Sequence, residues 1–274
     1  DNRIPKLLQM LGMTRYATAV ELVGNALIDI VENSGNNPFP PSAGLKSAVR
    51  EDTPKWDSDI SQQHGGEILW AQLRCEYARK NFTPAAAEDT MSHLVPDIIV
   101  ICKLLHSSHN TEEITSKESM KLSVLSLLKM TKFLDRADVS GGQELIKVCE
   151  NMLIDIKFPD ELVNHVLDAW LRGLGRADNQ MIMDNIKLLS EKFANIDSNS
   201  TEGLDELDIE VLTATRGLQL VCWALGKGVN GSDNNQRLSS DFYGFAIDSL
   251  QSTSPDMRRL AVQCLGMMSL SSEE

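Results

Sequence analysis

The stretch GQELIKVCENMLIDIKFPDELVNHVLDAWLRGLGRAD, residues 142–178, decides the fold. Its first part has apolar residues at three- and four-residue steps, the period of one helix face, at Leu145, Cys149, Met152 and Ile156. The breakers KFPD and GLGRAD then separate this run from two more helices. The three helix starts, near Gly142, Asp160 and Asp178, are about 18 residues apart, and such short connections leave room only for antiparallel neighbours.

Two such helices form a unit of roughly 35 to 40 residues, the length class of HEAT and armadillo repeats. One hairpin cannot cover its own apolar face, whereas stacked hairpins can. We therefore predict an all-α fold, a HEAT-type α-solenoid of stacked antiparallel helical hairpins, as a single domain over residues 1–274. Residues 35–65 and 197–207 are predicted to be flexible loops, because Pro, Gly, Asn and Ser or acidic residues dominate them. The start at Asp1 suggests a fragment of a longer chain.

The stretch SPDMRRLAVQCLGMMSL, residues 254–270, is a predicted helix with its own start signal. Ser254 can cap it, Pro255 suits the first helical position, and Asp256 favours the positive end of the helix dipole. The layout matches the second helix of a HEAT repeat at Asp256, Arg258, Ala261, Leu265 and Gly266. Arg258 is expected to support repeat stacking by pairing with a nearby acidic residue, and the role of Arg259 stays open.

Composition limits the partners of the chain. The 39 acidic and 26 basic residues give a net charge of −13, the reverse of what a free-standing nucleic-acid binder usually carries, so any DNA contact must be local. Five widely spaced cysteines fall mostly in apolar helical stripes, which fits free thiols in a reduced, intracellular compartment. No apolar run reaches membrane length, so we expect no membrane partner.

Two motifs with the spacing of a cofactor or metal site have weak contexts. GKGVNG, residues 226–231, has the glycine spacing of a dinucleotide phosphate loop, but a helical stripe precedes it where a strand is required. Cys102, His106 and His109 could share one helix face, yet no fourth metal ligand is near in sequence. No nucleophile or metalloprotease motif occurs either. We therefore expect no enzymatic activity, no cofactor and no bound metal.

The strongest cationic pattern lies on a helix that we predict to continue to Leu134, with the apolar stripe Met120, Val124, Leu127, Thr131 and Leu134. Roughly opposite that stripe are three candidates for contacts to the DNA backbone: Lys129, Lys132 and Arg136. A weaker second group is Arg74, Arg79 and Lys80. The alternative is that these side chains form an ordinary solvated face.

Several stretches together resemble the C-terminal HEAT region of the condensin subunit 3 (chromosome-associated protein G) family. They are DMRRLAVQCLGMMSL, preceded by a helix that ends SLQSTSP, then FPDELVNHVLDAWLRGLG, and LRCEYARKNF. The resemblance implies a scaffold that binds the kleisin subunit of condensin and, with it, holds double-stranded DNA without sequence specificity in mitotic chromosome condensation. It further implies an indirect link to the SMC ATPases through the kleisin, and a location in the nucleus on the chromosome.

Two other functions compete with this one. A HEAT or armadillo scaffold of the nuclear-transport or phosphatase-adaptor type would bind basic peptides, and the net charge of −13 favours it. An enzyme that uses GKGVNG would need a strand before the loop.

Overall fold

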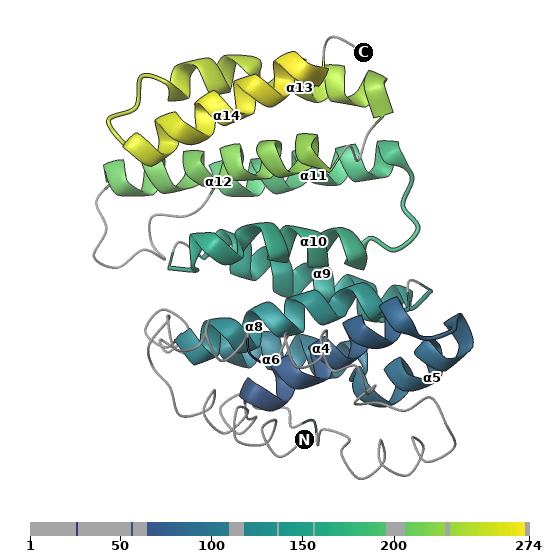
Figure 1. Cartoon of the computed structure of the whole chain (residues 1–274). Helices are drawn as coiled ribbons and strands as arrows, with labels where there is room; N and C mark the ends of the chain where they lie inside the picture. Colours follow the sequence, from purple (N-terminus) through teal and green to yellow (C-terminus); the bar gives the residue numbers. More distant parts are fainter. Residues whose placement is uncertain are drawn as a thin grey trace. The chain divides into compact units, whose positions relative to one another are not determined.

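The computed structural model describes Ala26, Trp56 and residues 65–109, 118–135, 137–155, 157–195, 206–227 and 231–271. Within these residues the structure contains ten α-helices, two short 3-10 helices and no strand (Figure 1). The predicted all-α class is therefore confirmed for the described part of the chain. The two predicted flexible loops lie outside the described residues, except for Trp56, for Gly65, which begins one helix, and for Glu206 and Leu207, which begin another.

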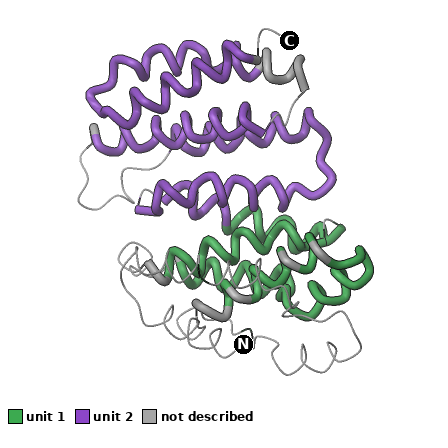
Figure 2. Tube along the Cα trace, viewed as in Figure 1, with its two compact units in different colours: residues 1–148 green, residues 149–274 purple. Residues whose placement is uncertain are grey.

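The chain divides into two compact units, Asp1–Val148 and Cys149–Glu274, and the boundary falls inside α9 (Val139–Ile154) (Figure 2). The first unit contains α4 (Gly65–Asn81), α5 (Pro84–Leu94), α6 (Ile98–His109) and α8 (Glu118–Met130). Within it, α4 packs against α5 and α8, and α6 packs against α8. Its core is formed by side chains that are almost completely buried, among them Ile68, Leu94, Leu104, Leu105 and Leu127.

The helix predicted to continue to Leu134 ends at Met130, so this prediction was wrong in its length. Thr131–Phe133 form a 3-10 turn, in which the Thr131 hydroxyl donates to the Leu128 carbonyl at 2.6 Å. Leu134 is then extended, with φ −68° and ψ 150°. The Thr131 hydroxyl therefore bonds to the last turn of α8 at the point where the regular helix gives way to the 3-10 turn.

The second unit contains η2 (Asp160–Leu162), α10 (Val163–Gly173), α11 (Asn179–Ala194), α12 (Glu206–Gly226), α13 (Gly231–Ser249) and α14 (Pro255–Ser271). The predicted starts near Asp160 and Asp178 are confirmed. The Asp178 side chain caps α11 by accepting from the Met181 amide at 2.8 Å. Gly175 has a φ of 66°, the left-handed conformation in which glycine ends a helix without strain. α13 begins at Gly231, although the composition of residues 228–236 favours a loop.

The helices of the second unit contact one another in two series. In one series α12 packs against both α10 and α14. Asp168 of α10 accepts a hydrogen bond from the indole of Trp223 in α12 at 2.7 Å, and it pairs with Lys227, directly after α12, at 2.8 Å. In the other series, ion pairs link α9 to α11 and α11 to α13: Glu150–Lys192 at 2.6 Å and Lys187–Asp241 at 2.8 Å. α11 also packs against α12, and α13 and α14 form an antiparallel hairpin (Figure 1).

In α14 the proposed HEAT positions have mixed roles. Ala261 is completely buried and Leu265 is half-buried, whereas Asp256 and Gly266 are exposed. Arg258 donates to the carbonyl oxygens of Ser252 and Thr253 at 2.7 and 2.8 Å. The expected acidic partner of Arg258 was therefore wrong: this arginine holds the turn between α13 and α14. Asp256 instead forms an ion pair with Arg259, at a distance of 3.7 Å between the carboxylate and the guanidinium, and both side chains are exposed.

Gly141, in the first turn of α9, lets the side chains of Ile98 and Asp138 lie close to the backbone of α9. A β-carbon at this position would collide with the Ile98 side chain at the start of α6 and with the Asp138 carboxylate. The Asp138 carboxylate also accepts from the Gly141 amide at 2.9 Å. Gly244 in α13 and Gly266 in α14 differ, because an added β-carbon would meet nothing within 4 Å.

We predict that Gly141→Ala lowers the free energy of unfolding by about 1–3 kcal/mol, the usual cost of forcing extra atoms into a packed site. Gly266→Ala and Gly244→Ala are matched controls, each expected to raise the stability by up to about 1 kcal/mol because alanine favours a helix interior more than glycine does. Urea unfolding followed by circular dichroism measures all three. Equal effects at the three positions would contradict the packing described for α6 and α9.

Candidate partner-binding site

The first group of predicted DNA contacts does not share one helix face. Lys129 is half-buried in the last turn of α8, and Lys132 follows the helix end in the 3-10 turn. Lys132 forms an ion pair with Glu76 at 2.5 Å and lies 5.0 Å from the Phe133 ring centroid. Arg136 lies outside the described residues. The prediction of a single cationic helix face was therefore wrong, and DNA contact by these residues stays a prediction.

The second group divides into buried and exposed members, all on α4. Arg74 is only 5% exposed, so its guanidinium cannot be presented to a phosphate backbone, and this candidate was wrong. Arg79 and Lys80 are exposed in the last turn of the helix, where the negative end of the helix dipole favours cations. Among the described members of the six predicted contacts, Arg79, Lys80 and Lys132 are exposed, and Lys132 pairs with Glu76.

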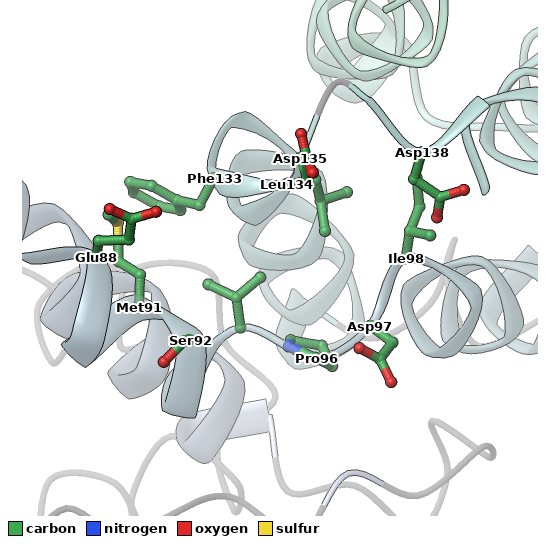
Figure 3. A pocket seen from close by; sticks show the side chains of 11 residues that line it. Glu88, Met91, Ser92, Pro96, Asp97, Ile98, Phe133, Leu134, Asp135 and Asp138 are labelled. Atoms are coloured by element: carbon green, nitrogen blue, oxygen red, sulfur yellow. The ribbon is translucent and has the colours of Figure 1, made fainter. Parts of the chain in front are cut away.

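The first unit also contains a pocket of about 370 Å³ that none of the predicted residues suggested. It lies where α5 ends, α6 begins and the chain leaves the 3-10 turn (Figure 3). Its apolar lining comes from Met91, Val95, Pro96, Ile98, Phe133 and Leu134. The backbone of Val95 is extended, as expected before a proline. The pocket lies at this break between α5 and α6.

Four carboxylates and no basic side chain line the pocket: Glu88, Asp97, Asp135 and Asp138. Two of them are used by the fold, because Asp135 accepts from the Ala137 amide and Asp138 from the Gly141 amide, both at 2.9 Å. Glu88 and Asp97 are exposed. An apolar lining with an acidic rim is complementary to a Lys or Arg side chain, whose aliphatic stem can lie on apolar surface while its charged end meets a carboxylate.

Cys102, His106 and His109, whose spacing resembles that of metal ligands, lie on the first-unit helix α6. Cys102 is buried on α6, and burial, with Glu144 and Asp138 nearby, raises the pKa of its thiol to about 12. A thiol with this pKa is protonated at neutral pH. His106 is exposed, and the side chain of His109 lies outside the described residues. Among the side chains that the structure describes, no three of the His, Cys, Asp and Glu type are grouped to hold a metal ion.

The GKGVNG motif follows a helix, as the sequence predicts. Gly226 is the last residue of α12 and Gly231 the first of α13, so the strand that a dinucleotide loop requires is replaced by a helix. Lys227 of the motif pairs with Asp168 of α10. Residues 228–230 lie outside the described part of the chain.

Comparison with known proteins adds no relative: no family model, curated protein or solved structure matches this chain. Separately, none of the described helices combines the length and the apolar character needed to cross a bilayer.

We predict that the double variant Arg79→Glu, Lys80→Glu weakens the binding of duplex DNA by a complex of this chain with its expected partner, a condensin kleisin. Loss of two phosphate contacts should reduce the slope of log affinity against log salt concentration by about 2. The charge-matched control is Lys157→Glu, Arg176→Glu, at two exposed positions of the second unit. Fluorescence anisotropy at several salt concentrations measures the slope, and the same loss in both double variants would mean that only net charge matters.

Proposed function

We propose that this chain is a non-catalytic scaffold of the HEAT type, a subunit of a condensin complex that binds the kleisin and contributes to holding double-stranded DNA on chromosomes in the nucleus. The single observation that carries the proposal is the repeated packing of the second unit. There α12 contacts a helix of the preceding pair and a helix of the following pair, as stacked hairpins require.

The ion pairs of the second unit support the same arrangement. Glu150–Lys192 and Lys187–Asp241 connect every other helix along the chain, α9 to α11 to α13. Each pair has at least one partner that is close to half exposed, so its contribution to stability is small, about 0–1 kcal/mol. These ion pairs support stacked hairpins because a Lys–carboxylate pair joins the first helix of one hairpin to the first helix of the next, and does so twice in succession. This order agrees with the resemblance to the condensin HEAT region.

The pocket of the first unit supports the partner-binding part of the proposal. A kleisin segment that carries Lys or Arg beside apolar residues would place its cation at Glu88 or at Asp97, which lie at opposite ends of the pocket (Figure 3), and its apolar neighbours against Val95 and Phe133. Such a segment would gain charge-assisted hydrogen bonds at a site with no competing protein cation in its lining.

A second candidate function is a scaffold of the nuclear-transport or phosphatase-adaptor type that binds basic peptides. The acidic lining of the pocket, together with a net charge of −13 and the burial of Arg74, favours it. These features support peptide binding more than DNA binding. The two candidates differ in the partner protein and in whether DNA is held at all.

Co-purification tests the proposal directly. We expect the full chain to form a stable complex with a fragment of a condensin kleisin and to retard duplex DNA only as that complex. A kleisin fragment from cohesin is the matched control and should not be retained. Failure to bind any condensin kleisin, combined with binding of a free basic peptide, would replace this proposal with the adaptor function.

A second prediction concerns the pocket itself. Glu88→Gln with Asp97→Asn removes two charges but preserves shape, and we expect it to weaken binding of a Lys- or Arg-containing segment about tenfold, the loss of roughly one charge-assisted hydrogen bond. Glu191→Gln with Asp248→Asn changes the charge equally at exposed positions of α11 and α13. Titration calorimetry measures both. Unchanged affinity in the pocket variant would show that the segment binds elsewhere.

A further inference from the structure

Two cysteines of the second unit lie beside each other on neighbouring helices. The sulfur of Cys222, on α12, is 3.8 Å from the carbonyl oxygen of Leu260, on α14. In an α-helix that carbonyl accepts from the amide four residues later, which belongs to Cys264. The Cys222 sulfur therefore lies within one turn of the Cys264 backbone, and the two thiols are close enough to shift each other's pKa. Both side chains are buried, Cys222 at 7% and Cys264 at 0% exposure.

We propose that Cys222 and Cys264 form a redox-modification site that closes to an intramolecular disulfide between α12 and α14. The oxidant belongs to the class of small peroxides, which are compact enough to reach a thiol that is mostly buried. The inference does not depend on the proposed function, because it rests on the packing of two helices alone.

The contact between the two thiols assigns them different chemical roles. The nearby Cys264 thiol lowers the pKa of Cys222, which burial alone would raise. The nearby Cys222 thiol and burial together raise the pKa of Cys264. Cys222 is therefore the thiol that ionises and attacks, and Cys264 is the one that resolves the product.

The chemistry is balanced in two steps. The Cys222 thiolate attacks one peroxide oxygen, the O–O bond breaks, and Cys222 sulfenic acid and hydroxide are formed. Cys264 then gives up its proton, its sulfur attacks the Cys222 sulfur, and the sulfenic oxygen leaves as water. Overall, two thiols and one hydrogen peroxide give one disulfide and two waters, so the thiols are oxidised and the peroxide is reduced.

Other buried cysteines provide an internal comparison. Burial raises the pKa of both Cys75 and Cys102 to about 12, so their thiolate fractions at neutral pH are far lower than that of an ordinary thiol. Neither belongs to the second unit, and neither lies on α12 or α14. Limited oxidation should therefore favour Cys222 and Cys264 over Cys75 and Cys102.

The test uses the full chain, fully reduced and then exposed to a small excess of hydrogen peroxide. We expect the number of thiols titratable under denaturing conditions to fall from the five of the sequence to three, and reductant to restore five. A digest without reductant should contain one cross-linked pair of peptides, with Cys222 in one and Cys264 in the other. No cross-link, or an equal loss of thiol at Cys75 and Cys102, would overturn the proposal.

Variants separate the two roles. Cys264→Ser should abolish the cross-link and leave Cys222 as a sulfenic acid that dimedone labels, whereas Cys102→Ser should leave the cross-link unchanged. Should Cys264→Ser fail to fold, the cross-link in the unmodified chain still decides the question. Dimedone labelling that is equally strong at Cys102 would contradict the assigned selectivity.

Discussion

The guanidinium of Arg216 is almost completely buried in the second unit, and the packing of α12 depends on the bonds that it makes there. One nitrogen donates to the Phe158 carbonyl at 2.6 Å, and the other lies 2.9 Å from the Asp160 carboxylate. Burial lowers the pKa of Arg216, while Asp160 and Asp155 act in the opposite direction, so the group stays charged. A buried cation must be hydrogen-bonded, and this requirement ties α12 to the turn before α10.

The position of α12 then decides the positions of its neighbours. This helix contacts both α10 and α14, and its residues Leu218, Leu220 and Val221 are completely buried. The same helix provides Trp223 for Asp168 and Cys222 for the thiol pair, and Lys227, directly after the helix, also pairs with Asp168. In the second unit, the packing of α12 therefore determines where these polar contacts between helices lie. In the first unit, by contrast, the candidate partner site lies at helix ends, where backbone breaks leave space.

The helices with local start signals were predictable from the sequence. Asp178 caps α11 and Pro255 begins α14, and in both cases the signal is read from neighbouring residues. The end of α8 was less predictable, because Thr131 and Leu134 continue the apolar stripe beyond Met130, the last residue of the helix. Tertiary packing outweighs composition in α13, which begins among residues of low helix propensity.

The candidate site was much harder to predict. The burial of Arg74 and the pairing of Lys132 with Glu76 depend on how α4 and the 3-10 turn pack, which helix spacing does not contain. The pocket carboxylates come from three segments, and Glu88 and Asp138 are far apart in sequence. The only local signal was the pair of helix breaks at Pro96 and Asp135, each with acidic residues beside it.

The central claim, a helical scaffold that binds a segment of condensin kleisin through its first unit, is tested most directly by amide hydrogen exchange. The full chain is compared alone and with an excess of the kleisin fragment. The account predicts slower exchange over residues 88–98, where α5 ends and α6 begins, with little change in α13. Unchanged exchange throughout residues 88–98, with the fragment bound, would contradict it.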